Sequence, residues 1–265
     1  MTYFLVIEMT NINIKNIKVG NANLSCISTN DALSLLDLWL MKNNKKKSII
    51  FCNSYSISLA ETKKNFSEVI NNGDIIFPDG FPVSLLMRIG GYKEAKRIAG
   101  PDFISDLCSY NFSKKISIFL LGSTKSVLFK LKKNLNSTYK NINICGFYSP
   151  PFDKHDKKEI KKINLLINSK RPDFVFVGMG CPKQEIWMAN NKSKINSILI
   201  GFGAAFDFHA NEKKRAPVIL RKFCLEWLFR FAQEPKRLWK RYTVSNLIFL
   251  YSILKNILIN FLKND

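Results

Sequence analysis

The sequence predicts an α/β fold in which a mostly parallel sheet is flanked by helices and followed by a basic helical appendage. Three observations predict this fold. Patterns of buried strands alternate with helical patterns, glycines recur where strands end, and basic residues gather near the C-terminus. A chain of 265 residues of which 46% are hydrophobic can bury a large core. Disordered, collagen-like and low-complexity chains are thereby excluded.

Six short apolar runs rich in Ile, Val and Phe are predicted as buried strands. In chain order they are Ser48–Cys52, Asp74–Phe77, Ile116–Leu121, Asn143–Phe147, Asp173–Val177 and Ser197–Ile200. Segments with helical spacing lie between them, such as Ala32–Leu40 behind a cap signal at Asn30 and Asp31. This alternation requires crossover connections, which favour parallel strands covered by helices. Residues 1–210 are therefore predicted as a Rossmann-like α/β core.

The composition changes from about Asn211, where residues 211–265 are predicted to form a basic, amphipathic appendage. Residues 211–241 hold ten Lys and Arg against three Glu, interleaved with aromatic residues. Val244–Leu262 is rich in large apolar residues but carries a stripe of polar ones, too interrupted for a membrane span. A helix lying in a membrane interface is the favoured interpretation. The alternative is a C-terminal helix packed on the core, with solvated lysines.

The net charge of the chain indicates which classes of partner it can bind. The chain has 41 Lys and Arg against 20 Asp and Glu, a formal net charge of +21, which favours polyanions. Nucleic acid, an anionic membrane and phosphorylated substrates are the candidates. A nucleic-acid recognition module is not apparent, and the basic residues concentrate beside an apolar helix, so nucleic acid is the weakest of the three.

Cysteine spacing and the N-terminus indicate where the protein acts. The six cysteines form no C-x-x-C pair and do not cluster with His155 or His209. This argues against zinc and a disulfide framework, and for a reducing compartment. The first residues lack the basic region and cleavage site of a signal peptide, so we expect a cytoplasmic protein.

Glycines mark the predicted ligand edge of the sheet, because ligands of parallel sheets bind where strands end and helices begin. Gly178 and Gly180 follow one strand, and Gly201 and Gly203 follow the next. Such glycines let backbone approach a ligand and expose amides to anions. Neither pair continues as G-x-G-x-x-G, and a Walker loop is absent from the sequence, so a dinucleotide cofactor is not expected.

Asp79, in the run FPDGFP, directly follows a predicted strand. A carboxylate at such a junction can project into a cleft and act as a general base. Proline-Asp-Gly is also a common turn signal, and on the residues alone a simple turn is the stronger interpretation.

Two charged residues follow in the run RIAGPD. Arg97 suits bidentate binding of phosphate or carboxylate, with an exposed helix-end cation as the alternative. Asp102 is predicted to be the N-cap of the next helix.

Two further runs offer polar groups to a ligand. In VGMGCPKQE, Gln184 and Glu185 are predicted in the first turn of a helix at the ligand edge, where they suit sugar, base or hydroxyl groups. In GFGAAFDFHA, Asp207 is predicted to face a ligand or a backbone amide, while its two neighbouring phenylalanines pack inward.

Six ordered motifs resemble the WecG/TagA/CpsF family of bacterial glycosyltransferases, glycosyltransferase family 26. They are P-D-G at Pro78–Gly80, R-x-x-G-x-D at Arg97–Asp102, G-x-G-x-P-x-Q-E at Gly178–Glu185, G-x-G-A-A-F-D-F at Gly201–Phe208, R-A-P at Arg215–Pro217, and E-W-L-x-R with a following E-P-x-R at Glu226–Arg237. They cover nearly the whole chain.

The resemblance implies an inverting transfer of N-acetylmannosamine or its uronic acid from a UDP-sugar to an undecaprenyl-diphosphate-linked acceptor. Such enzymes act in surface polysaccharide or teichoic acid synthesis, at the cytoplasmic face of the bacterial membrane, as peripheral proteins. Another UDP-hexose donor, used for capsule or exopolysaccharide, is the alternative. Neither cofactor nor metal is expected, because cationic side chains can supply the electrostatics. The sequence does not decide whether the chain forms homo-oligomers.

The same resemblance implies roles for individual residues. Asp79 would be the general base, Arg97 would bind diphosphate, and Asn53 would lie near a substrate sugar. The remaining expected substrate-binding residues are Gly178, Gly180, Gln184, Glu185, Gly203, Asp207, Arg230, Arg237 and Arg241. The family's T-x-N motif is Phe51-Cys52-Asn53 here, so a threonine hydroxyl is missing.

Overall fold

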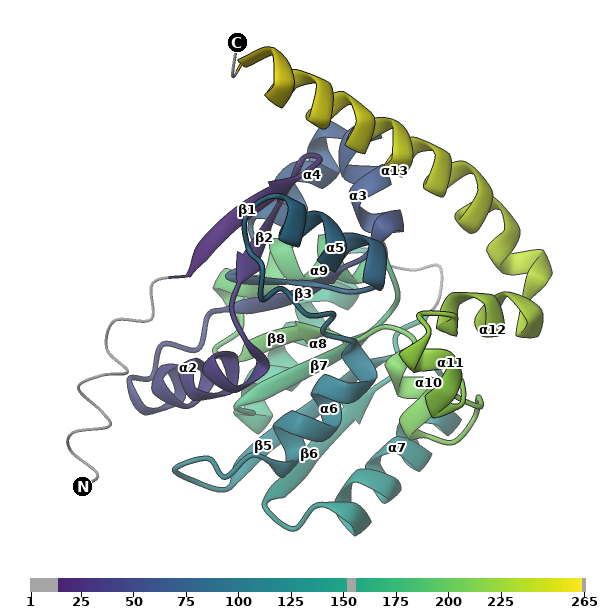
Figure 1. The fold of residues 1–265 in the computed structure, drawn as a ribbon. Coiled ribbons are helices and arrows are strands. Elements are labelled where there is room, and N and C mark those ends of the chain that lie inside the picture. Colours follow the sequence, from purple (N-terminus) through teal and green to yellow (C-terminus); the bar gives the residue numbers. More distant parts are fainter. Residues whose placement is uncertain (1–13, 152–155, 264–265) are drawn as a thin grey trace.

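A computed structural model gives the fold. It describes residues 14–151 and 156–263, with backbone alone at residues 222, 237, 240, 241 and 254–263. The predicted α/β architecture is confirmed, with helices on both faces of a parallel sheet (Figure 1).

The sheet has six parallel strands in the order β4-β3-β8-β7-β5-β6. Their bounds are β3 (Ser48–Cys52), β4 (Ile75–Pro78), β5 (Ile116–Gly122), β6 (Ile142–Tyr148), β7 (Phe174–Gly178) and β8 (Ile198–Gly201). All six predicted strands are thus present, with slightly shifted ends. After β4 the chain crosses to the far side of the sheet to form β5 and β6, and β7 and β8 then fill the gap beside β3.

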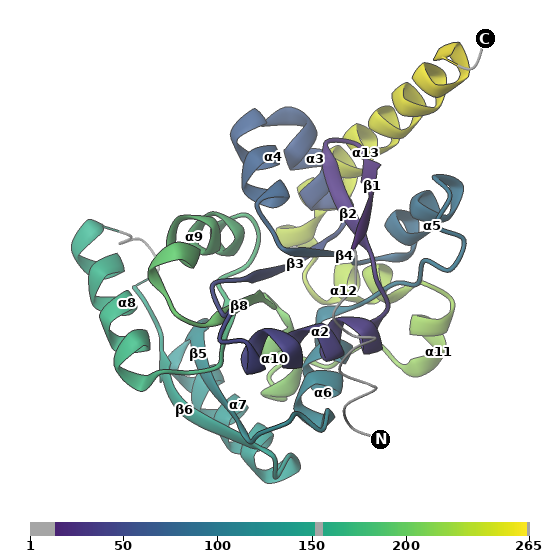
Figure 2. The same ribbon diagram turned by 90° about the vertical axis from the view of Figure 1, so that its left-hand side faces the viewer.

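A β-hairpin that the sequence analysis did not predict precedes the sheet. Its strands β1 (Lys15–Val19) and β2 (Ala22–Cys26) are antiparallel, and Figure 2 shows them beside β4. The backbone N–H of Ile76 donates to Ser25 Oγ at 3.0 Å, which ties the hairpin to β4. These strands carry Asn, Lys and Ser at several positions, so they lack the apolar run that identifies the other six.

Two apolar layers hold helices against the sheet, because successive strand side chains point to opposite faces. On one face α2, α6, α7 and α10 pack, and on the other α3, α4, α5, α8 and α9. The bounds are α2 (Thr29–Met41), α3 (Ser54–Thr62), α4 (Lys64–Asn71), α5 (Phe81–Ile89), α6 (Gly100–Ser109), α7 (Lys125–Thr138), α8 (Lys157–Lys170), α9 (Lys183–Asn191), the 3₁₀ turn η2 (Lys192–Lys194) and α10 (Ala205–His209).

The predicted start of α2 was wrong by a few residues. Ser28, not Asn30 or Asp31, is the N-cap, and its hydroxyl accepts from the N–H of Asp31. Serine is as good a cap as Asn or Asp, so propensity alone does not choose among neighbouring candidates.

The C-terminal segment, residues 211–263, contains α11 (Val218–Lys222), α12 (Glu226–Gln233) and α13 (Pro235–Lys263). The long α13 crosses the top of the molecule in Figure 1 and packs on α3. Ser58 Oγ donates to the backbone carbonyl of Ser245, and Ser54 Oγ donates to Asn246 Oδ1. Among the described helices, none is both long and apolar enough to cross a membrane.

The orientation of α13 separates its polar stripe from its apolar face. Ser245 is 8% exposed and Ser252 is buried, since both turn toward the core. Leu247 and Tyr251, each 68% exposed, turn outward. Ser245 thus lies against α3, Phe249 packs into the core, and other large apolar side chains are left on the outer surface.

Asp173 anchors the amino end of β7. Lys45 Nζ and Lys114 Nζ each lie 2.7 Å from its Oδ1, and the N–H of Ser117 donates to its Oδ2. Burial raises the pKa of this carboxyl, but the hydrogen bonds from Lys114 and Lys45 outweigh burial and hold the pKa below its ordinary value.

Replacing Asp173 by Ala is expected to lower the free energy of unfolding by about 3 kcal/mol, because two lysines lose their buried partner. Because the pKa is lowered on folding, this stabilisation is present above the unfolded pKa of about 3.9 and shrinks at lower pH. Urea unfolding at neutral and acidic pH checks both statements. Asp106→Ala, at an exposed position on α6, is the control, and equal effects of the two substitutions would contradict the prediction.

Candidate active site

A cleft of about 980 Å³ opens at the carboxyl edge of the sheet. Residues that follow every one of the six strands line it, and so do side chains from α12 and α13. It brings together these predicted site residues: Asn53, Asp79, Arg97, Gly178, Gly180, Gln184, Glu185, Gly203, Asp207 and Arg230. The side chains of Arg237 and Arg241 lie outside the described part of the chain, as does His155.

Asp79 lines this cleft. Its N–H donates to the carbonyl of Cys52 at 2.9 Å, so β4 still pairs with β3 where the carboxylate begins to project. Gly80 follows with a φ of 103° and starts α5. The Asp79 side chain is 27% exposed, so the carboxylate is accessible to a ligand rather than packed in the core.

Arg97 is the cation nearest to this carboxylate among the ion pairs of the described residues. Its Nε lies 3.9 Å from Asp79 Oδ1, and its Nη2 donates to Glu226 Oε2 on α12. Burial lowers the pKa of the guanidinium, but the charges of Asp79 and Glu226 outweigh it and raise the pKa. Arg97 is therefore a fixed cation in the cleft and not the exposed helix-end residue of the alternative interpretation.

Asp102 is not the N-cap that the sequence predicted. Ala99 is the N-cap of α6, and Asp102 lies in the first turn of that helix. Its two carboxylate oxygens accept from Arg215 Nη1 and Nη2 at 2.6 and 2.7 Å. Burial raises the pKa of Asp102, but Arg215 outweighs it and lowers the pKa. The Asp102 side chain therefore pairs with Arg215, which is distant in sequence, and does not cap the helix.

Gln184 ties two glycine loops together. Its Oε1 accepts from the N–H of Gly180, and its Nε2 donates to the carbonyl of Gly201, both at 3.2 Å. Nε2 also donates to Glu185 Oε1 at 2.8 Å. The amide that was expected to contact a sugar is therefore bonded to the walls of the cleft, where it sets their spacing.

Glu185 is almost fully buried in the cleft wall. Burial, and then the charges of Glu185 and Asp79, raise the pKa of the Cys52 thiol far above its ordinary range. Cys52 is therefore not a nucleophile at neutral pH, since only the thiolate is reactive.

Glycine is required where the cleft wall meets α10. A Cβ on Gly178 would lie 2.4 Å from Cδ2 of Phe206, whose ring is buried beneath it. Gly180 has a φ of 77°, which side chains rarely adopt. Both glycines thus keep backbone, rather than side chains, at the surface of the cleft.

Asn53 and Asp207 each have a structural partner. Asn53 is the N-cap of α3, with Oδ1 accepting from the N–H of Ser56 at 3.1 Å. Asp207 pairs with Lys213 Nζ at 3.1 Å. Both also line the cleft, so a structural bond and exposure to a ligand coexist at each position.

The remaining motif residues of this region also have defined neighbours. The guanidinium of Arg230 lies 5.7 Å from the ring centre of Phe208. His209 Nε2 lies 2.8 Å from the carbonyl of Pro101, and burial chiefly lowers the pKa of this imidazole. A tied, neutral histidine accords with a packing role.

Phe51 occupies the corner where the threonine was expected. Its ring is nearly buried among those of Phe77, Phe103 and Phe202, at centroid distances of 5.4 to 5.7 Å. It still lines the cleft, so an apolar ring replaces a hydroxyl there.

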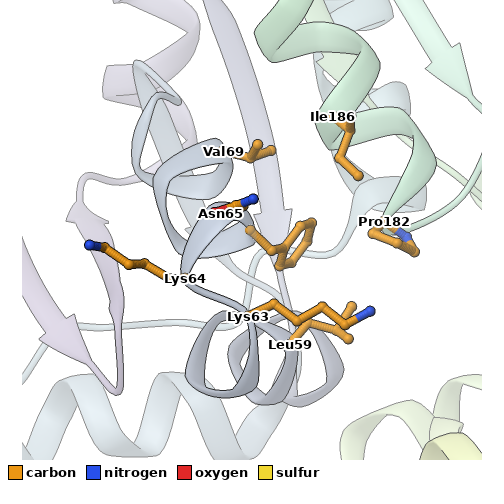
Figure 3. Close-up of a pocket in the computed structure, with 8 residues that line it drawn as sticks. Leu59, Lys63, Lys64, Asn65, Val69, Pro182 and Ile186 are labelled. Atoms are coloured by element: carbon orange, nitrogen blue, oxygen red, sulfur yellow. The ribbon is translucent and has the colours of Figure 1, made fainter.

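A second pocket of about 570 Å³ lies between α3, α4 and α9 (Figure 3). Its walls are mainly apolar, from Leu59, Phe66, Val69, Pro182 and Ile186. The lining contains lysines and an asparagine but not a carboxylate. It therefore lacks the general base that the larger cleft has.

Among the described residues, no group of three or more His, Cys, Asp or Glu is arranged so that it could hold a metal ion. The cations that line the described cleft are Arg97, Lys183 and Arg230. These side chains can offset anionic charge there.

Fold and cleft define an α/β protein with a carboxylate, Asp79, beside a fixed arginine, Arg97, at the strand ends. The chain belongs to the glycosyl transferase WecG/TagA/CpsF family, whose sequence profile matches residues 17–262. It is thus a glycosyltransferase, and the resemblance noted from the motifs is confirmed.

Similar curated proteins come from Staphylococcus aureus. Those of strains MW2 and NCTC 8325 are each 31% identical to this chain over 208 residues. The match covers 78% of this chain and 79% of each relative. Both relatives are named N-acetylglucosaminyldiphosphoundecaprenol N-acetyl-beta-D-mannosaminyltransferase.

The sequence analysis assigned no role to several residues that line the cleft. Ser123 and Thr124 follow β5, Pro150 follows β6, and Glu226 and Tyr242 come from the C-terminal segment. Strand-end position could have identified the first three. Glu226 lies in a sequence motif, but its contact with Arg97 could not be predicted because the two residues are distant in sequence.

Replacing Arg215 by Gln is expected to loosen the C-terminal segment, because the bidentate pair with Asp102 is lost. A hydrogen bond to a charged group contributes enough to raise the open population about tenfold. Limited chymotrypsin digestion at Phe223 should accelerate to that extent. Arg171→Gln, at an exposed position after α8, should not change the rate, and equal digestion of both variants would contradict the prediction.

Proposed function

We propose that the protein transfers N-acetyl-D-mannosamine from its UDP-linked form to an N-acetylglucosamine linked to undecaprenyl diphosphate. The accessible Asp79 carboxylate, 3.9 Å from Arg97 in the cleft, is the observation that carries the proposal. The names of the Staphylococcus aureus relatives support the choice of sugar and acceptor.

In the proposed step, Asp79 takes the proton from the acceptor hydroxyl as its oxygen attacks the anomeric carbon. A new glycosidic bond forms as the bond to the UDP oxygen breaks, and UDP leaves with that electron pair. Attack on the face opposite to UDP inverts the configuration. The two substrates are the only reactants consumed in this single displacement, and the proton that Asp79 takes balances the step.

Leaving-group charge is offset by side chains in this scheme. Negative charge builds on the diphosphate as the bond breaks, and preorganised cations stabilise it. Arg97 and Arg230 are the proposed cations, and Arg237 and Arg241 are proposed to join them when substrate is bound. The glycine loops are proposed to contact the donor through backbone amides.

The C-terminal segment is proposed to be a membrane-associating appendage of the α/β core, with its boundary near residue 211. Support comes from its basic composition and from the outward apolar side chains Leu247 and Tyr251. The protein would then work as a peripheral enzyme at the cytoplasmic face of the membrane, where the lipid-linked acceptor resides.

Purified protein is expected to move label from UDP-[¹⁴C]N-acetylmannosamine to the lipid-linked acceptor. Replacing Asp79 by Asn is expected to lower kcat by about 10²- to 10⁴-fold, because general base catalysis contributes that much. Asp106→Asn is the matched control. Label transfer by Asp79→Asn at the wild-type rate would overturn the assignment of the base, and failure of wild-type transfer with this donor would overturn the donor.

Replacing Leu247 by Glu is expected to weaken binding to vesicles containing phosphatidylglycerol at least about tenfold, because a buried leucine contributes that much to membrane affinity. Cosedimentation measures this. Leu165→Glu is the control, since Leu165 is similarly exposed on α8, at 61%. If both substitutions weaken vesicle binding equally, or if neither weakens it, α13 does not contact the bilayer.

A further inference from the structure

Glu226 is a buried carboxylate that the proposed mechanism leaves without a role. It is the first residue of α12 and is only 7% exposed, although it belongs to the C-terminal segment. Its two oxygens face different cations. Oε2 accepts from Arg97 Nη2, and Oε1 lies 3.6 Å from Arg215 Nε.

The arrangement places one anion between two arginines. Arg215 is held independently by the bidentate pair with Asp102, so the far side of Glu226 is anchored to α6. Burying a lone carboxylate is costly, and two cations offset that cost. Arg97 and Arg215 would repel each other without Glu226, so this carboxylate fixes where Arg97 lies.

The Nε edge of the Arg97 guanidinium lies on the side of Asp79. Nε is buried, has no hydrogen-bond partner among the described residues, and lies 3.9 Å from Asp79 Oδ1. The guanidinium is thus fixed through Nη2 while its Nε edge faces the proposed base. A planar, rigid group held at one end keeps its other edge in place.

We propose that Glu226 is a positioning residue for the transfer reaction, acting through Arg97. It holds the guanidinium of Arg97 in the cleft, where Arg97 is proposed to offset the diphosphate charge, and it links α12 to the cleft. This inference rests on the proposed function. A competing arrangement is a plug, in which Glu226 occupies the site of the diphosphate and leaves when substrate binds. The burial of Glu226 and its second cation favour positioning.

Full-length Glu226→Gln tests this, with Glu212→Gln as the matched control. Glu212 lies in the same segment and pairs with Lys130, away from the cleft. Because a contact needed in the transition state lowers kcat and leaves KM unchanged, we expect kcat of Glu226→Gln to fall about tenfold with KM for both substrates within about twofold. Glu212→Gln should match wild type.

A double-mutant cycle separates positioning from loss of fold. If Glu226 acts through Arg97, Arg97→Gln/Glu226→Gln will be no slower than Arg97→Gln alone. If the double variant instead loses kcat by the product of the two single effects, the inference is overturned. An unchanged kcat in Glu226→Gln would overturn it as well. A fall in donor KM with kcat retained would indicate the plug instead. Failure of the wild-type enzyme to transfer the sugar would count against the proposed function, not against the role of Glu226.

Discussion

The parallel order of the sheet is the constraint on which the site depends. Parallel strands all end at one edge of the sheet. In the order β4-β3-β8-β7-β5-β6, the chain forms β3 and β4 on one side, then β5 and β6 on the other, and returns to form β7 and β8 between them. Such reversals of order leave a crevice at the strand ends. Asp79, the glycine loops and Asn53 meet there although they are far apart in sequence. The chemistry of the cleft follows from this convergence.

Ion pairs join the basic C-terminal segment to that edge. Asp102 and Glu226 alternate with Arg97 and Arg215, so cations of one part face anions of the other. Hydrogen bonds from α3 to Ser245 and Asn246 of α13 complete the attachment. An excess of positive charge can therefore coexist with close packing, because the contacts at the joint are paired. The outer apolar face of α13 remains available for the membrane role proposed above.

Much of the fold was predictable because its six central strands are short, mostly apolar runs that alternate with segments of helical spacing. The β1–β2 hairpin was not, since polar residues conceal its alternation. In the site, strand ends placed Asp79 and Gly178 at the ligand edge, but the residues alone favoured a simple turn at Asp79, and only the family resemblance implied a role as base. The pairing of Asp102 with Arg215 and the burial of Glu226 depend on residues over a hundred positions apart, and spacing carries little information about such contacts. Gln184 was located correctly, but its bonds to Gly180 and Gly201 depend on how two loops meet.

The proposed reaction is one displacement at the anomeric carbon, assisted by Asp79 as the base in the cleft. NMR of the first product formed from a UDP-α-linked donor tests this step most directly, because the one-bond C1–H1 coupling of the mannosamine residue differs between the α and β anomers and so reports which face was attacked. A single displacement gives a β-linked product from the earliest time points. An α-linked product would require a second displacement, and it would contradict the single step assigned to Asp79.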